Sequence, residues 1–179
     1  MATALVLLAS GFEEIEAVTI IDVLRRGEVA VTTASLSGKH VKGSHDIVIE
    51  ADTLLDAVSV DDFDALVLPG GPGAKTLRED AHVQTTIQRA AAAGKLLAAV
   101  CAGPTALEVA GVLRGKRATA YPGSQLPSAR LVEERVVEDG NIITSRGPGT
   151  TMAFALKVVE RLSGAAIAKT TAERLLFTP

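Results

Sequence analysis

Aromatic residues are scarce in this chain: they make up 3% of its 179 residues, with no Trp and a single Tyr, Tyr121. Stacking platforms for nucleic-acid bases and aromatic cages for cations need several aromatic side chains, so we expect neither. An excess of charge of one sign is also lacking, because 18 basic residues nearly balance 21 acidic ones and leave a net charge of −3. A surface that binds nucleic acid or an anionic membrane is therefore not expected.

Cysteine is almost absent from the sequence. The chain has one, Cys101, which excludes an internal disulfide and argues against a cysteine-based zinc site. No signal peptide is evident, and no apolar run approaches the roughly 18 residues of a membrane span. These absences predict a protein of a reducing compartment, the cytoplasm, with no membrane partner.

Apolar residues make up 47% of the chain, enough for a substantial core, and the length fits one domain over residues 1–179. Short apolar runs predict buried strands at 4–9, 65–68 and 96–100, and a more alternating run predicts another at 29–36. Helical patterns occur at 14–26, 80–93, 103–109, 152–162 and 165–176, and hairpin patterns at 39–50 and 131–145. The alternation of strands and helices predicts an α/β fold with a mostly parallel sheet.

Chemically versatile residues follow the ends of the predicted strands. Glutamates come after the first strand, glycines follow the strand at 65–68, Cys101 follows the strand at 96–100, and Arg146 follows the second hairpin. The carboxyl ends of parallel strands lie along one edge of a sheet, where ligands bind in open α/β folds. We therefore expect these groups to converge on one site.

Cys101 is the candidate nucleophile. It lies in the segment Ala99–Gly103, whose small residues resemble the G-x-S-x-G strand–turn–helix motif with Ala at the first glycine position. Such a turn places the thiol at a helix N-terminus, where free N–H groups favour the thiolate. A buried, inert core cysteine is the alternative. We favour a reactive thiol whose pKa lies below its usual ~8.5.

Three acids, Glu13, Glu14 and Glu16, stand at the start of the first predicted helix. Complementing the helix dipole accounts for Glu13 and Glu14. Glu16, in contrast, shares its helix face with Ile20 and Val23, so we expect it to be buried. Burial raises the pKa of a carboxyl group, which would let Glu16 exchange a proton with the thiol or with a substrate.

The same helix is apolar over most of its circumference, whereas a sheet covers one side of it. A second copy of the chain would cover the other side, so we expect a homodimer. The three histidines, His40, His45 and His82, are not at metal-ligand spacing from the cysteine or an acid, so no metal site is expected. A phosphate-binding loop is also lacking, and we expect no cofactor.

Four segments resemble the DJ-1/PfpI superfamily, and within it the branch of the parkinsonism-associated deglycase and its bacterial relatives. They are Gly11–Glu16, Val67–Gly71, Ala99–Leu107 and Thr144–Thr150. They occur in this order and span nearly the whole chain, which makes the resemblance specific. It implies a flavodoxin-like sandwich with helices on both faces of the sheet, and a homodimer.

The resemblance also implies a function. Cys101 would be the nucleophile and redox-sensitive thiol of a cofactor-independent glyoxalase or deglycase, and Glu16 the acid hydrogen-bonded to it. The substrates would be small reactive aldehydes, methylglyoxal or glyoxal, and their early adducts, in defence against carbonyl and oxidative stress. Further implied residues are Gly70, Gly71 and Ala102 as backbone oxyanion donors, and Arg26 and Pro148 as contributions to the partner subunit's site. The alternatives are a non-enzymatic redox sensor or stress chaperone that uses the same cysteine, and a cysteine peptidase.

Three positions depart from the family pattern. Peptidase relatives carry His next to the nucleophile, whereas Ala102 follows Cys101 here, which argues against a peptidase. The animal branch has a His before the last hairpin, where we place Ser128, so the base that this His would supply is missing. His45 stands where that branch often has Arg. The two latter departures affect rate and substrate preference more than the existence of the site.

Overall fold

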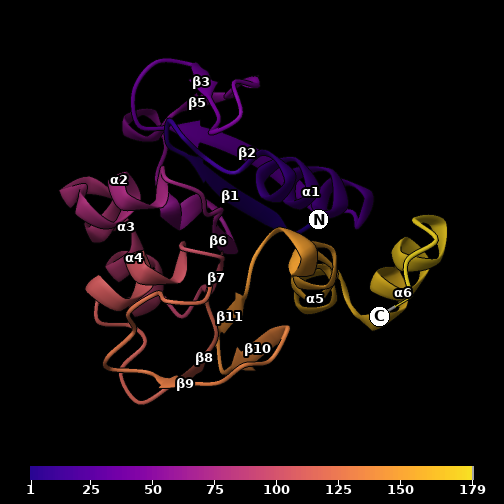
Figure 1. Cartoon of the computed structure of the whole chain (residues 1–179). Coiled ribbons are helices and arrows are strands. Elements are labelled where there is room, and N and C mark those ends of the chain that lie inside the picture. Colours follow the sequence, from indigo (N-terminus) through magenta and orange to yellow (C-terminus); the bar gives the residue numbers. More distant parts are fainter. Residues whose placement is uncertain (179) are drawn as a thin grey trace.

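The computed structural model describes residues 1–178, and a seven-stranded sheet forms its centre (Figure 1). The strand order is β10-β11-β7-β6-β1-β2-β5. The strands are β1 (Thr3–Leu8), β2 (Ala30–Ser35), β5 (Thr53–Leu54), β6 (Ala65–Leu68), β7 (Leu96–Val100), β10 (Val136–Asp139) and β11 (Ile142–Ser145). Every neighbouring pair is parallel except β10 and β11. The predicted, mostly parallel sheet is confirmed.

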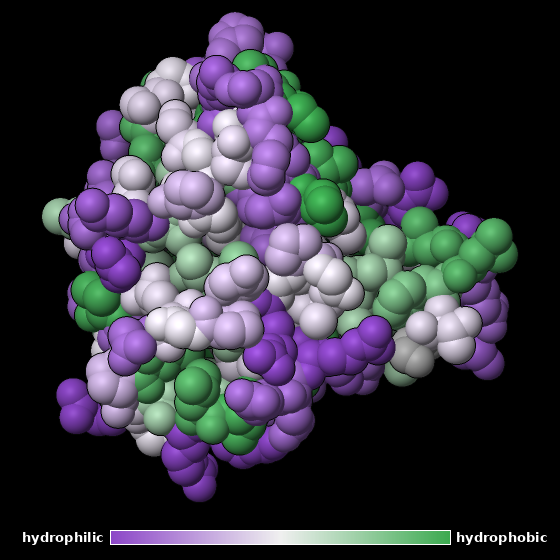
Figure 2. All heavy atoms as spheres, in the orientation of Figure 1, coloured by the Kyte–Doolittle hydropathy of each residue, from purple (hydrophilic) through white to green (hydrophobic). Residues whose placement is uncertain are grey.

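Helices cover both faces of the sheet, as in a flavodoxin-like sandwich. On one face lie α1 (Glu14–Arg26), α5 (Thr151–Ser163) and α6 (Ala165–Arg174), and on the other α2 (Ala74–Glu79), α3 (Ala81–Ala92) and α4 (Pro104–Val109) (Figure 1). Single-turn helices η1 (Leu55–Ala57), η2 (Val60–Asp62) and η3 (Pro148–Thr150) lie in the connections. The segment that contains α6 extends from the body (Figure 1) and carries apolar surface (Figure 2). Leu176, just after α6, is 93% exposed.

The central strands supply both halves of the core. Alternate side chains of β1 point to opposite faces, so Val6 and Leu8 join the core beneath α1 and α5 while Leu5 and Leu7 join the core beneath α3 and α4. All four are fully buried. Continuous apolar runs therefore suit these strands, because each has a helical layer on both sides.

Both predicted hairpins form, with one change of bounds. β3 (His40–Lys42) pairs antiparallel with β4 (Val48–Glu50), and β10 pairs antiparallel with β11. The second hairpin begins at Val136 rather than at residue 131, because Arg130–Leu131 forms β9, which pairs in parallel with β8 (Arg117–Ala118). This two-stranded sheet and the short β5 were not predicted.

The predicted helices are confirmed with small shifts at their ends. The Asp80 side chain accepts the N–H of Val83 and caps α3, so this helix begins at Ala81. The last helix ends at Arg174, and Leu176 adopts the left-handed conformation (φ 55) that ends helices. Across residues 1–178, no helix combines the length and apolar character that crossing a bilayer requires.

The strand order creates a crevice at the carboxyl edge of the sheet. The chain passes from β1 to β2 on one side and later returns to β6 on the other side of β1, so the connections after β1 and β6 leave in opposite directions. Ligands of open α/β sheets bind at such a switch point. Glu13–Glu16, Gly70–Gly71 and Cys101 follow β1, β6 and β7, which are neighbours in the sheet.

Candidate active site

The backbone at Cys101 has the conformation of a nucleophile elbow. Its φ of 62° lies in the left-handed region, which non-glycine residues rarely adopt outside functional turns. The Cys101 N–H donates to the carbonyl of Ser145 at 3.0 Å, which ties the turn to β11. Gly103 packs tightly beneath the turn, since a Cβ there would lie 2.6 Å from the Leu68 carbonyl oxygen. The sharp strand–helix turn expected from the small residues is therefore present.

Glu16 is fully buried beside the thiol, as its apolar helix face predicts. Its Oε2 accepts the N–H of Gly70 at 2.7 Å. The other oxygen, Oε1, is buried with no hydrogen-bond partner among the described residues. The side chain of Glu13 accepts the N–H of Glu16 at 2.8 Å, so Glu13 caps α1 and fixes the start of the helix.

Gly70 brings the thiol and the carboxyl group together. A Cβ on Gly70 would lie 2.5 Å from the Cβ of Cys101 and 2.8 Å from Glu16 Oε2, so the site has no space for a side chain here. The N–H of Gly70 is already donated to Glu16. The expectation that Gly70 donates to an oxyanion is therefore wrong: this residue positions the acid, because its amide points at the carboxyl group.

Two other backbone N–H groups face the Cys101 sulfur. They belong to Gly71 and Ala102, and their hydrogen bonds to the sulfur lower the pKa of the thiol. Gly71 has a φ of 84°, and a Cβ on it would lie 2.5 Å from the backbone nitrogen of Glu13. The role of Gly71 and Ala102 as oxyanion donors, which the family resemblance implies, stays a prediction.

Burial controls the electrostatics of the Cys101–Glu16 pair. Desolvation raises the pKa of Glu16 to about 7, although hydrogen bonds from Cys101 and Gly70 oppose the increase. Desolvation and the charge of Glu16 raise the pKa of Cys101 to about 12 and outweigh the two N–H donors. The predicted lowering of the Cys101 pKa is therefore wrong, because the sequence argument counted the helix N-terminus and left out burial beside a carboxylate. Above pH 7 the pair holds one negative charge and one proton.

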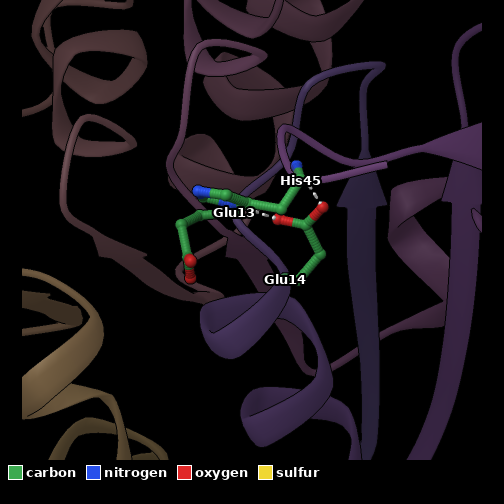
Figure 3. Close-up of side chains that lie close together, drawn as sticks. All are labelled: Glu13, Glu14 and His45. Atoms are coloured by element: carbon green, nitrogen blue, oxygen red, sulfur yellow. Dashed lines mark hydrogen bonds and ion pairs between the residues drawn. The ribbon is translucent and has the colours of Figure 1, made fainter. Parts of the chain in front are cut away.

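A second cluster is formed by Glu13 and Glu14, at the start of α1, and by His45 of the β3–β4 hairpin turn (Figure 3). Glu14 is nearly buried and holds the turn of the β3–β4 hairpin: its carboxylate accepts the Ser44 hydroxyl at 3.0 Å and lies 3.0 Å from His45 Nδ1. The His45 N–H also donates to Glu14. Sequence reasoning assigned Glu14 to the helix dipole and found no acid near a histidine, because the two segments are far apart in the chain.

The titration of this cluster fits an ion pair. Burial tends to raise the pKa of Glu14, but hydrogen bonds from the His45 side chain and backbone outweigh it and lower the pKa to about 2. The hydrogen bond to Glu14 raises the pKa of His45. Carboxylate and imidazole atoms from Glu13, Glu14 and His45 lie within 4.8 Å of one another, a spacing that suits a metal ion. Glu13 and Glu14 already act as helix cap and hairpin anchor, so we assign the cluster a structural role.

Tyr121 is the functional candidate that sequence reasoning missed. Its N–H donates to the carbonyl oxygen of Cys101 at 2.8 Å, and its ring lies against Gly147 in the loop after β11. Ser128, the position expected to replace the family's histidine, instead donates its N–H to Glu108 on α4. The residue of this segment bonded to the nucleophile is therefore Tyr121. The single tyrosine of the chain, three residues after the short β8, was the available signal.

Two residues, Arg26 and Pro148, are expected to reach a partner subunit. Arg26, at the end of α1, forms an ion pair with Asp22 at 2.8 Å, and Pro148 opens η3 after β11. The surface of α1 exposes Ile15 and Val18, which are 59% and 49% accessible. The exposed apolar face predicted for α1 is thus present, and its burial by a second copy stays a prediction.

The fold and site together define an α/β sandwich with a cysteine at a strand–helix elbow and a buried acid beside it. A model of the DJ-1/PfpI family matches residues 2–161, and this chain belongs to that family. It is similar to Protein DJ-1alpha of Drosophila melanogaster, with 46% identity over 98% of this chain and 84% of that protein. It is also 35% identical to a protein named deglycase from Pyrococcus abyssi, over 88% of this chain and 98% of the relative. The crystal structure of Drosophila melanogaster DJ-1beta superposes with a TM-score of 0.96 at 43% identity and covers 99% of each chain.

Proposed function

We propose that this protein is a cofactor-independent glyoxalase or deglycase that acts on methylglyoxal, glyoxal and their early adducts in the cytoplasm. The observation that carries the proposal is the buried Cys101–Glu16 pair, which has one proton to share and two N–H donors beside the sulfur. Membership of the DJ-1/PfpI family and similarity to a relative named deglycase support the same chemistry.

The first step is addition of the thiol to the aldehyde. The Glu16 carboxylate accepts the Cys101 proton while the sulfur bonds to the aldehyde carbon, and the carbonyl electron pair moves to oxygen. The N–H groups of Gly71 and Ala102 stabilise the resulting alkoxide. Glu16 then returns its proton to this oxygen, which gives a hemithioacetal and a carboxylate ready for the next step.

The second step is an internal redox exchange that needs no cofactor. Glu16 removes the proton from the former aldehyde carbon and delivers it to the neighbouring carbonyl carbon, while the hydroxyl proton of the hemithioacetal passes to the neighbouring carbonyl oxygen. One carbon is thereby oxidised to a thioester, and the other is reduced to an alcohol. Water cleaves the thioester, releases a 2-hydroxy acid and restores the thiol. For an early adduct, the amine or thiol that carries the aldehyde leaves when Cys101 takes its place.

The decisive assay measures lactate formed from methylglyoxal by the purified protein without glutathione. We expect turnover by the wild type and its loss in Cys101→Ala, with the far-ultraviolet circular dichroism spectrum unchanged. Activity of Cys101→Ala within tenfold of the wild type would overturn the assignment of the nucleophile.

A second candidate function, redox sensing, is favoured by the same donors. A sulfinate on Cys101 would place its negative charge against the N–H groups of Gly71 and Ala102 and against protonated Glu16. A single cysteine in the chain also leaves no internal partner for a disulfide. Intact mass spectrometry after graded peroxide should show a sulfinate before a sulfonate, whereas a dominant intermolecular disulfide would contradict this function.

We also propose that the working unit is a two-fold homodimer. The exposed apolar residues of α1, Ile15 and Val18, and those of the nearby hairpin, Ile47 and Val48, offer a surface for a second copy. Arg26 and Pro148 would then approach the partner's site, as the family resemblance implies.

A further inference from the structure

An open cavity of about 430 Å³ lies beside the nucleophile. Gly71 and Ala102, whose N–H groups face the Cys101 sulfur, form the part of its wall nearest the site. The loop 122–125 after Tyr121 forms the opposite wall. Cavities of this size hold ligands much larger than methylglyoxal. The site therefore has room for a substituent attached to the aldehyde carbon that Cys101 attacks.

The charged side chains around the cavity are unevenly distributed. Lys75 and Arg78 project from α2 into its lining, and Arg78 is also paired with the exposed Glu79 at 3.1 Å. The acidic residue in the lining is Glu108 of α4. One oxygen of Glu108 accepts the N–H of Ser128 at 2.9 Å, and the other is buried. Glu108 thus presents its carboxylate inward, while the accessible charges of the cavity are cationic.

We propose that Lys75 and Arg78 make the site selective for aldehyde adducts that carry a carboxylate, such as adducts on free amino acids. This proposal rests on the proposed function and names its substrate class. Arginine binds carboxylates through a pair of parallel N–H groups, and lysine adds a flexible point charge, so together they suit a small anion whose exact position varies. A neutral aldehyde would use the thiol and its two N–H donors without these contacts.

The position of the two cations on one helix supports this role. Lys75 and Arg78 are separated by three positions on α2, so their side chains leave the same helix face. The backbone at the start of α2 is fixed against the loop after β1, because Gly73 donates its N–H to the carbonyl oxygen of Gly11 at 2.8 Å. The backbone that carries the two cations is therefore anchored close to Gly71, because Ala74 also donates its N–H to the carbonyl oxygen of Gly71 at 3.0 Å.

The first test uses alkylation and needs no turnover. Iodoacetate and iodoacetamide both transfer a carbon to the Cys101 sulfur with loss of iodide, and they differ in the charge of the group that is carried. Both rates depend in the same way on the reactivity of the Cys101 thiol, so a change in that reactivity cancels in their ratio. We expect Lys75→Gln or Arg78→Gln to lower the iodoacetate-to-iodoacetamide ratio about threefold, and the double variant about tenfold, as for partly exposed charge pairs. Intact mass spectrometry gives both rates, because Cys101 is the one cysteine in the chain.

A matched control separates a local effect from a change in net charge. Lys169, an exposed lysine of α6, lies outside the cavity lining, and Lys169→Gln removes the same charge. We expect this variant to keep the wild-type ratio. An unchanged ratio in the double variant, or an equal decrease in Lys169→Gln, would overturn the proposal.

The second test measures turnover of two matched adducts, the hemithioacetals of methylglyoxal with N-acetylcysteine and with N-acetylcysteine amide. The wild type should have a higher kcat/KM for the N-acetylcysteine adduct, which carries a carboxylate, than for the amide adduct. In the double variant the ratio of these two kcat/KM values should fall about tenfold, mostly because KM for the carboxylate adduct rises. Turnover of both adducts without a preference would refute the role of the cations and leave the proposed function intact. Turnover of neither adduct would refute the proposed function, and the alkylation ratio would still decide whether Lys75 and Arg78 recognise a carboxylate.

Discussion

Replacing Glu16 with Gln should make the protein more stable and nearly inactive at the same time. The folded protein raises the pKa of Glu16 from 4.5 to about 7, so it disfavours the charged carboxylate. Each pKa unit corresponds to about 1.4 kcal/mol, which places the cost of ionised Glu16 near 3 kcal/mol at alkaline pH. The amide of Gln is uncharged, and its oxygen is able to accept the Gly70 N–H that Glu16 Oε2 now accepts.

The pH dependence follows from the direction of the shift. Because the folded pKa is raised, the favourable contribution of Glu16 is fully present below pH 4.5 and is lost as the pH rises through about 7. Between pH 5 and pH 8, the free energy of unfolding of Glu16→Gln should therefore increase by about 2.5 kcal/mol relative to the wild type. Other carboxyl groups with altered pKa, such as Glu14 and Asp52, are present in both proteins and cancel in the difference.

Urea unfolding of both proteins at several pH values measures this difference directly. In the same preparations, turnover of methylglyoxal should fall by at least ~100-fold in the variant, since an amide cannot transfer the proton. A stability difference that stays constant between pH 5 and pH 8 would show that Glu16 is not held in a desolvated, proton-sharing site. Equal turnover in both proteins would refute its role as the base.

Three further predictions concern the pH profile, the glycine beside the nucleophile and the dimer. In the wild type, kcat/KM for methylglyoxal should fall about tenfold per pH unit below pH 7, because the Cys101–Glu16 pair then carries two protons and has no base. A flat profile of kcat/KM down to pH 5 would contradict this prediction. Gly70→Ala should reduce kcat/KM by roughly 100-fold, because its Cβ would lie 2.5 Å from the Cβ of Cys101. The control Gly149→Ala, which places its Cβ in open space, should retain activity. Equal effects of the two substitutions would refute the packing argument. Val18→Asp should convert the dimer to a monomer in light scattering at micromolar concentration, and a monomeric wild type would refute the proposed interface.

Much of the fold could be predicted because burial and chain direction leave clear patterns in the sequence. Residues 4–9 and 65–68 are uninterrupted apolar runs, and the structure confirms that each forms a strand covered on both faces. The buried position of Glu16 was also predictable, because its face of the helix is otherwise apolar. Each of these predictions depends only on residues that lie close to one another in the sequence.

Contacts between distant segments could not be predicted in the same way. Glu14 anchors the hairpin turn at His45, and Gly70 donates its N–H to Glu16 rather than to an oxyanion. Tyr121 bonds to Cys101 from a loop that carries no periodic pattern. The raised pKa of Cys101 has the same origin, because desolvation depends on how completely the surrounding segments cover the thiol.

The left-handed backbone at Cys101 has a consequence for how this sequence can change over time. A glycine would adopt a φ of 62° without strain, whereas a residue with a side chain costs about 1 kcal/mol or more in this region. If folding stability were the only constraint, glycine at position 101 and glutamine at position 16 would both be favoured. A thiol and a carboxyl group at these two positions are therefore costly for folding, as expected of residues that the proposed chemistry requires.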